Sequence, residues 1–135
     1  MKLSAQQMQT GLRPDPAFAA WYGEEFMKIH LPQSYFGVSD EGRPEMILNG
    51  RRYAEQFGFT DIRAQMRFIT LMWQIGANFF VHPGFREVLA DRRLPELERV
   101  DQIYNGLKDQ ATYAIMNPDD RYWYPYMVPK QGPAT

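Results

Sequence analysis

The sequence predicts an all-α fold: a compact single-domain bundle of five to six helices, followed by an extended aromatic C-terminal tail. Apolar residues recur at spacings of three and four over most of the chain, which is the helical period. No sustained alternation of period two indicates a strand. A chain of 135 residues is the size of one domain. We place the helical bundle at residues 1–116 and the tail at residues 117–135.

Two helices are predicted before residue 32. Ser4 caps a short helix that ends near Gly11. Asp15 and Pro16 start the second, because proline in the first helical turn loses no hydrogen bond. This helix ends at Leu31-Pro32, since the residue before proline is pushed out of the helical region. The apolar residues of its inner face are Phe18, Trp21, Tyr22, Phe26 and Ile29.

Residues 33–41 are predicted to form a loop, and a third helix follows to about Phe57. Two starts are open for this helix: Ser39 can cap it, or it can begin later with Pro44 in its first turn. Gly58 suits a left-handed position after the last turn. The predicted inner face is Met46, Ile47, Gly50, Tyr53, Ala54 and Phe57.

The segment from Ile62 to Ile75 is predicted to be the central helix, capped by Thr60 and ended by Gly76. It is apolar around most of its circumference, which is typical of a helix surrounded by others. One stripe consists of Ile62, Met66, Ile69 and Trp73, and the residues that widen it are Phe68, Leu71, Met72 and Ile75.

Two further helices are predicted after a connection at residues 78–82. Pro83 opens a short helix that runs to about Ala90, and a last long helix starts near Leu94-Pro95. We interpret Asn49-Gly50 and Asn105-Gly106 as helix interior, where another helix approaches closely. The seam of the last helix follows the residues Leu97, Val100, Tyr104, Leu107 and Ala111.

The composition excludes several classes of function. The chain has no cysteine, which excludes thiol catalysis and zinc-thiolate sites and fits a reducing compartment. Its 15 basic and 16 acidic residues nearly balance, which argues against nucleic acid as a partner. No apolar run has the length of a signal peptide or a membrane span. We therefore expect a cytoplasmic protein with no membrane partner.

No constellation of reactive side chains indicates an enzyme. His30 and His82 are the only histidines, each at a predicted helix end, and neither has a second ligand at metal-binding spacing. The three serines lie outside any nucleophile elbow, and no glycine-rich phosphate loop is present. We predict no catalytic residue, no cofactor site and no metal site. A possible basic face is interpreted as solvated helix surface paired with acidic neighbours; its residues are Arg51, Arg52, Arg63 and Arg67, with Glu55 and Asp61.

The C-terminal tail is the main candidate for a binding site. Two prolines exclude a regular helix, so we expect this segment to be extended. Its dense aromatic residues beside an arginine have the composition of an interface hot spot. The alternative is that the tail folds back and covers the bundle's own apolar grooves. The candidate partner-binding residues are Arg121, Tyr122, Trp123, Tyr124, Tyr126 and Met127.

A family resemblance adds a biological context. An aromatic-Gly pair precedes a helix at Phe57-Gly58, a Met-X-X-X-Gly-X-X-Phe element spans residues 72–79, and a Leu-X-Asp helix end lies at residues 89–91. This pattern resembles a group of small uncharacterised bacterial proteins encoded beside type VI secretion spike, tip and effector genes. The resemblance covers most of residues 1–107. The tail lies outside it, and Gly42 and Pro44 depart from it.

The resemblance implies an accessory role without enzymatic activity. We expect an adaptor or co-chaperone that binds a protein: a secreted effector, a spike or tip protein, or another adaptor. The first alternative is an immunity protein that neutralises a cognate toxin, although the neutral charge disfavours a nuclease as that toxin. An enzyme is the second alternative and would need a pocket with convergent polar groups. The oligomeric state is left open.

Overall fold

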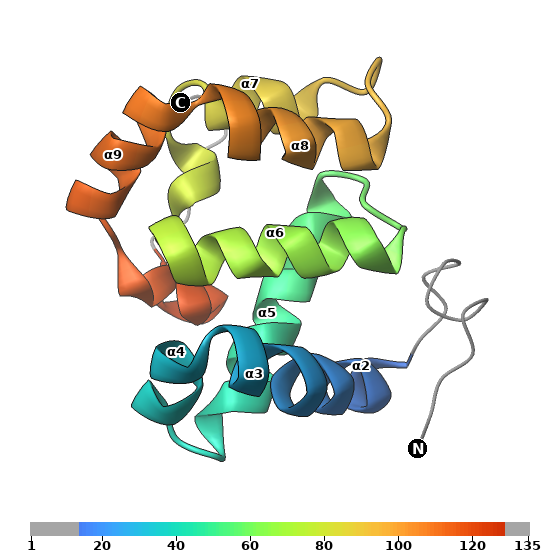
Figure 1. Ribbon diagram of the computed structural model, residues 1–135, viewed down its shortest axis with the longest axis vertical. Helices are drawn as coiled ribbons and strands as arrows, with labels where there is room; N and C mark the ends of the chain where they lie inside the picture. The colour runs from blue at the N-terminus through green and yellow to red at the C-terminus, as the bar shows by residue number, and fades with distance from the viewer. Residues whose placement is uncertain (1–13, 129–135) are drawn as a thin grey trace.

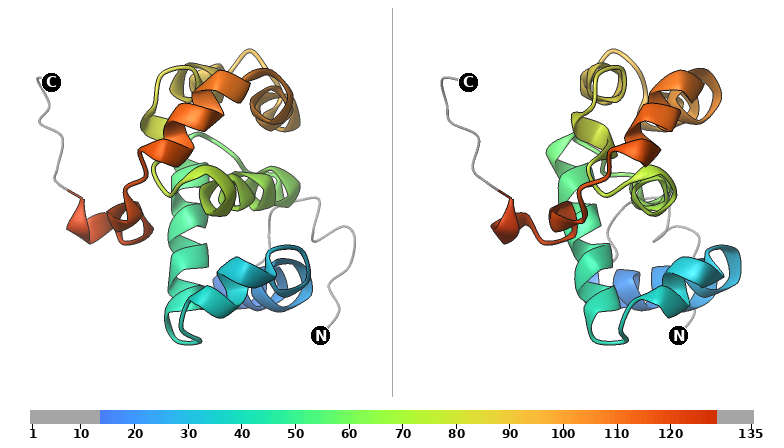
Figure 2. Two further views of the ribbon diagram at one scale, coloured as in Figure 1. Left: turned by 60° about the vertical axis from the view of Figure 1, so that its left-hand side comes forward. Right: turned by 90° about the vertical axis from the view of Figure 1, so that its left-hand side faces the viewer.

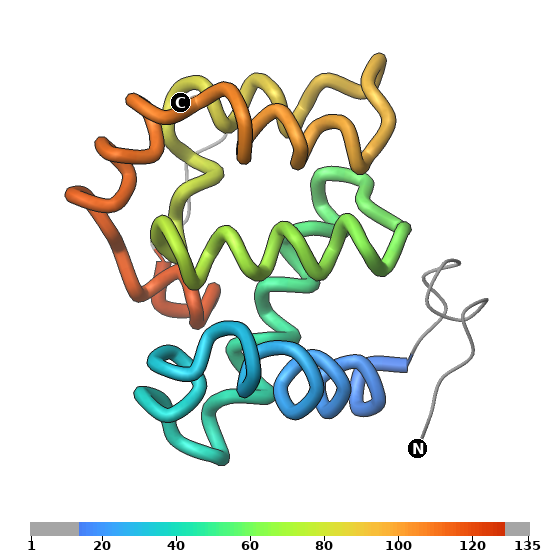
Figure 3. Tube along the Cα trace, in the orientation of Figure 1, coloured from blue at the N-terminus to red at the C-terminus, as the bar shows by residue number. Residues whose placement is uncertain are grey.

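The structure is a computed structural model that describes residues 14–128, and every regular element in that range is helical. Helices α5 (Gly42–Gln56) and α6 (Ile62–Ile75) pack against each other at the centre of the molecule (Figure 1). The N-terminal helices lie on one side of α6 and the helices of residues 85–106 lie on the other (Figure 3). The predicted all-α bundle is confirmed. The short helix predicted from Ser4 to Gly11 lies outside the described residues.

Helix α6 is enclosed by its neighbours, as its apolar circumference predicts. Met66, Trp73 and Ile75 are half-buried, and the other residues of the predicted apolar surface are buried. Gly76 ends the helix with a φ of 132°, a backbone conformation that other residues rarely adopt. The buried residues of α6 are Ile62, Ala64, Gln65, Phe68, Ile69, Thr70, Leu71 and Met72.

The N-terminal cap of α6 is Asp61 rather than the predicted Thr60. The Asp61 carboxylate accepts a hydrogen bond of 2.8 Å from the backbone N–H of Arg63. Thr60 instead donates its backbone N–H and its hydroxyl to the carboxylate of Glu96, at 2.7 Å and 3.0 Å. Burial alone would raise the pKa of Asp61, but hydrogen bonds from Arg63 outweigh it and hold that pKa below its usual value.

Replacing Asp61 by alanine is therefore expected to lower the free energy of unfolding by about 1 kcal/mol at pH 7. Because the pKa is depressed in the folded state, this contribution is present above about pH 4 and disappears as the pH falls further. Urea unfolding at pH 7 and pH 3 measures both effects. The control Thr60→Ala removes one exposed hydrogen bond and should cost about 0.5 kcal/mol or less. A larger loss in Thr60→Ala than in Asp61→Ala would contradict this assignment of the cap.

Helices α5 and α6 approach closely at Gly50. A Cβ atom added at this glycine would lie 3.1 Å from Ile69 Cγ1 and 3.2 Å from Met72 Sδ, which is tight for a carbon contact. The interpretation of Asn49-Gly50 as helix interior against another helix is confirmed. At the N-terminus of α5, the hydroxyl of Ser39 accepts a hydrogen bond from the backbone N–H of Gly42, and Pro44 lies in the first turn. Ser39 and Pro44, predicted as alternative starts, therefore both contribute to the start of α5.

The first described helix contains a π-helical turn. Elements α2 (Asp15–Trp21), η1 (Tyr22–Met27) and α3 (Lys28–His30) follow one another without a break, and η1 has the wider π-helical hydrogen-bond pattern. The extra residue in this turn rotates the following residues, so Met27 is fully buried and Ile29 is 66% exposed. The prediction that Ile29 faces inward is therefore wrong.

Two connections differ from the predictions. Residues 33–41 were expected to form a loop, but α4 (Pro32–Gly37) is a short helix that starts with its proline and buries Tyr35. The predicted long C-terminal helix is broken into α8 (Glu96–Gly106) and α9 (Lys108–Met116), which run in different directions (Figure 1). The break follows Asn105-Gly106, so their interpretation as continuous helix interior is wrong, because glycine is a weak helix former.

Within residues 14–128, the buried apolar side chains form two clusters. One lies among α5, α6, η2 (Phe79–Val81), α7 (Phe85–Ala90), α8 and the tail, and Phe68 occupies its centre with its ring 5.1–6.0 Å from four other phenylalanine rings. The other lies among α2, η1, α4, α5 and α6. Trp73 packs against both clusters, so the C-terminal half of α6 joins them.

Candidate functional site

The aromatic tail is docked on the bundle through Trp123. Its indole ring stacks on that of Trp73, with ring centroids 4.0 Å apart, and Trp123 is only 5% exposed. The side-chain amide of Asn49 on α5 donates a hydrogen bond of 2.7 Å to the backbone carbonyl of Trp123. The tail segment lies beside α5, as the two turned views in Figure 2 show. Trp123 thus belongs to the core.

Asn78 holds the start of the tail. Its carbonyl oxygen accepts a hydrogen bond of 2.9 Å from the backbone N–H of Asp119, and its amide donates to the backbone carbonyl of Asn117 at 3.3 Å. Further along, the ring of Tyr122 lies 5.7 Å from that of Phe80. Two asparagine side chains from the bundle therefore fix the backbone of the tail at both ends of its docked part.

The six candidate partner-binding residues fall into two groups. Trp123 is buried and Tyr122 and Tyr124 are half-buried, as the fold-back alternative predicts. The exposed members, available to a partner, are Arg121, Tyr126 and Met127, and the last two are 78% and 51% exposed.

The backbone of the tail also differs in detail from the expected extended chain. It forms two short 3₁₀ turns, η3 (Asp120–Trp123) and η4 (Pro125–Met127). Each turn is closed locally, by bonds such as that from Tyr124 N–H to the carbonyl of Arg121. Because a 3₁₀ turn needs only three residues, proline at its start does not prevent it. Residues 129–135 of the predicted tail lie outside the described residues.

Beside the docked tail lies an open pocket of about 450 Å³. Its walls come from five segments: α4 and Val38, α5 through Met46, the C-terminal end of α6, the end of α9, and the tail. Most lining side chains are aliphatic, methionine or aromatic. The lining residues are Ser34, Gly37, Val38, Met46, Met72, Trp73, Gln74, Ile75, Gly76, Ala77, Ile115, Pro118, Asp120, Trp123 and Tyr124.

Exposed apolar side chains lie on the same segments as the pocket. Ile115 lines the pocket and is 54% exposed, and its neighbour Met116 is 75% exposed. Phe36, directly before the lining residue Gly37, is 70% exposed. With Tyr126 and Met127, these residues account for most of the large apolar side chains that residues 14–128 expose. We call Phe36, Ile115, Met116, Tyr126 and Met127 the apolar rim.

A second hollow, of about 680 Å³, lies between α2, η1 and α5. The charged residues in its lining are Glu24, Asp40 and Arg43, and of these Arg43 is buried. The guanidinium donates hydrogen bonds to the carbonyls of Tyr35 and Val38, pairs with Asp40 and lies 3.6 Å above the Tyr35 ring. These bonds tie α4 to α5, and we assign Arg43 a structural role.

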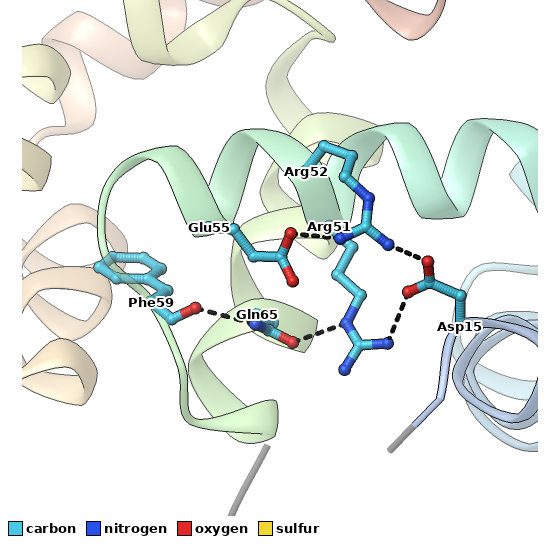
Figure 4. A network of polar contacts seen from close by, with 6 residues as sticks. All are labelled: Asp15, Arg51, Arg52, Glu55, Phe59 and Gln65. Atoms are coloured by element: carbon cyan, nitrogen blue, oxygen red, sulfur yellow. Dashed lines mark hydrogen bonds and ion pairs between the residues drawn. The ribbon is translucent and has the colours of Figure 1, made fainter. Parts of the chain in front are cut away.

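The predicted basic face is largely a network of structural ion pairs. Arg51 is 3% exposed, so its interpretation as a solvated surface residue is wrong. It donates to the side-chain oxygen of Gln65 and to Asp15, both at 2.9 Å, and its guanidinium lies 4.3 Å from the ring of Phe18 (Figure 4). Arg52 bridges Asp15 and Glu55, as the predicted pairing with Glu55 requires. The network fastens α2 to α5 and α6.

The remaining two arginines of the predicted basic face lie on the surface of α6. Arg63 pairs with Asp61 at 2.8 Å, as predicted. Arg67 pairs with Asp101 of α8 at 2.5 Å. Since each guanidinium has a carboxylate partner, these residues do not form an open basic patch for nucleic acid.

The two histidines occupy separate parts of the surface. The ring of His30 lies 4.8 Å from that of Phe26, and the ring of His82 lies 5.3 Å from that of Tyr113. Between residues 14 and 128, no three histidine or acidic side chains are grouped closely enough to hold a metal ion. The same part of the chain contains no helix with the length and apolar character needed to cross a membrane.

Sequence reasoning missed the pocket although it singled out the tail. Trp73 and Trp123 are separated by 50 positions, and nothing in their local sequence pairs them. The only available signal was the excess of aromatic residues and methionine in the composition. Comparison of the chain with protein-family models, curated proteins and solved structures finds no match. The site therefore has to be interpreted from its own geometry.

Proposed function

We propose that this chain is a non-enzymatic protein-binding accessory factor that uses the pocket beside the docked tail. The observation that carries the proposal is the combination of an open pocket, lined mostly by aliphatic, methionine and aromatic residues, with the exposed apolar side chains of the apolar rim. Large exposed apolar side chains mark interaction sites when they gather in one region, and those of the apolar rim lie on segments that also line the pocket. Methionine and aromatic side chains supply large contact area and adapt to a partner's shape.

The docked tail gives the pocket a defined shape. Trp123 is fixed by its stacking on Trp73 and by the hydrogen bond from Asn49, so one wall needs no ordering when a partner binds. Pre-ordering of this kind reduces the entropic cost of association. The exposed Tyr126 and Met127 then extend the contact surface beyond the pocket.

The partner we propose is a component of type VI secretion, as the sequence resemblance implies. The chain would bind a secreted effector in the cytoplasm, cover an apolar segment of it, and present it to the spike or tip protein. An immunity protein that binds a toxin with the same surface remains the alternative. The two roles differ in their consequence for the cell and not in the chemistry of the surface.

The proposal predicts that polar substitutions in the rim abolish partner binding without unfolding the protein. The double variant Ile115→Ser/Tyr126→Ser should bind copurifying effector or tip proteins at least about tenfold more weakly, which corresponds to about 1.4 kcal/mol. Pull-down followed by calorimetry with the captured partner measures the change. The matched control is Tyr104→Ser, because Tyr104 is 40% exposed on α8 and does not line the pocket. Equal binding by both variants would rule out this surface.

A toxicity assay separates adaptor from immunity protein. Cells that produce the effector are complemented with this chain, and their survival is counted. An adaptor leaves the toxin active, whereas an immunity protein must protect the cells. Protection that is lost in Ile115→Ser/Tyr126→Ser would replace the adaptor proposal with the alternative.

A further inference from the structure

The pocket lies where two helices end. The last turn of α6 supplies Gln74, Ile75 and Gly76 to its lining, and the last turn of α9 supplies Ile115. The carbonyl end of a helix carries partial negative charge. Neither helix has a basic residue in its last turn. The carbonyls of Gln74, Ile75 and Ile115 accept no hydrogen bond from the described residues.

The end of α4 also borders the pocket, but its charge is already compensated. Arg43 donates hydrogen bonds through Nη2 to the carbonyls of Tyr35 at 2.9 Å and Val38 at 3.4 Å. The positive charge of Arg43 therefore compensates the partial negative charge at the end of α4. The ends of α6 and α9 lack such a partner among residues 14–128.

Asp120 adds a full negative charge. Among the described residues that line the pocket, it is the only charged one. It has no ion pair or side-chain hydrogen bond to any residue that the structure describes, whereas its neighbours Asp119 and Arg121 pair with each other at 2.7 Å. Arg121, the nearest basic residue in the sequence, is therefore already paired with Asp119. The carboxylate of Asp120 remains available to pair with a cation of a bound molecule.

Aromatic side chains complete the site. Trp73, Trp123 and Tyr124 all line the pocket, and the two indoles are stacked. Aromatic faces attract cations, and tryptophan does so most strongly. Val38, Met46 and Met72 provide apolar surface for an aliphatic stem.

We infer that the pocket receives a basic side chain, arginine or lysine, from the protein partner. The stem packs on the aliphatic and methionine walls, and the charged head lies among Asp120, the aromatic rings and the carbonyl ends of α6 and α9. This inference rests on the proposed function and names the chemistry of the partner's anchor. The chain as a whole is nearly neutral, so the negative charge at the pocket does not follow from the net charge. It comes from Asp120 and the nearby helix ends.

A pair of isosteric probes tests the charge directly. N-acetyl-arginine methylamide and its neutral citrulline analogue are titrated into the full-length protein, and the indole N–H resonances of Trp73 and Trp123 are followed by NMR. The arginine probe should shift these resonances and bind at least about fivefold more tightly than the citrulline probe. Its binding should weaken as salt is raised, because exposed charges are screened.

Asp120→Asn should weaken binding of the arginine probe about three- to fivefold and leave citrulline binding unchanged. The control Asp109→Asn makes the same chemical change on α9 outside the pocket and should have no effect. Asp120 is exposed, so neither variant is expected to unfold, and circular dichroism checks this. Equal affinity for the two probes, or insensitivity to Asp120→Asn, would overturn the inference.

Two further outcomes are informative. Tighter binding of tetramethylammonium than of the arginine probe would assign the pocket to a free organic cation and overturn the partner-anchor inference. Loss of partner binding in Ile115→Ser/Tyr126→Ser with full binding by Asp120→Asn would leave the proposed function standing and remove only the basic anchor. Failure of the inference and failure of the proposed function are thus measured by different variants.

Discussion

Replacing Trp123 by alanine is expected to lower the free energy of unfolding by about 3–5 kcal/mol, the usual cost of deleting a large buried aromatic side chain. Trp123 is 5% exposed and stacks on Trp73 at 4.0 Å, so the variant loses both the buried area and the aromatic pair. Urea unfolding monitored by circular dichroism measures the loss. If the tail were not docked on the bundle, the substitution would cause almost no loss of stability.

Tyr126→Ala is the matched control. It removes another aromatic side chain three positions along the same tail, but Tyr126 is 78% exposed. Its cost should stay within about 0.5 kcal/mol. Equal and small losses in the two variants would contradict the docked tail. The same reasoning shows that deletion of the whole tail after Asn117 is a poor test of function, because it removes a core residue together with any binding surface.

The second large effect is expected at Arg51. Arg51→Ala should lower the free energy of unfolding by about 2–3 kcal/mol, because it leaves the side-chain oxygen of Gln65 buried without its arginine donor and opens a void beside Phe18. The side chain of Asp15 is 42% exposed and can be hydrated, so the cost stays below that of a fully buried pair. Chemical unfolding at low and high salt measures the change.

Arg52→Ala is the control for Arg51. It makes the same substitution at the next residue and breaks two ion pairs, but the Arg52 side chain is 43% exposed, so the loss should be at most about 1 kcal/mol. The variant Arg51→Met keeps most of the apolar stem and should lose less stability than Arg51→Ala, and Gln65 keeps the hydrogen bond of 2.8 Å from its amide to the backbone carbonyl of Phe59. If Arg52→Ala proves as costly as Arg51→Ala, surface charge rather than burial governs this network.

The helical period determined how much of the fold could be predicted. Along α5 and α6 it identified the inner faces, including Gly50 at the helix crossing, because burial repeats with the backbone geometry. The same argument failed after Tyr22, where the π-helical turn changes the period and Ile29 turns outward. It also failed at Gly106, since a seam at spacings of three and four continues in the sequence even where the backbone bends.

The candidate site could be predicted only in part. Composition identified the tail, but the depth of each side chain depends on partners that no local pattern indicates: Trp73 and Asn49 for Trp123, and Asn78 for Asp119. Arg51 is a second example, in which a residue predicted to be exposed is buried. Its sequence neighbourhood is charged, which predicts exposure, and yet its guanidinium is buried and donates to Asp15 and Gln65, which lie 36 and 14 positions away.

The π-helical turn at Tyr22–Met27 has a consequence for recognising relatives of this chain. Such a turn holds one more residue than the α-helical turn it replaces, and is therefore equivalent to a single-residue insertion that the helix absorbs without a loop. A homologue with an uninterrupted α-helix here would be one residue shorter and still superimpose on both sides of the turn. Alignments that forbid gaps inside helices would then pair Met27 and every residue before α4 with the wrong positions.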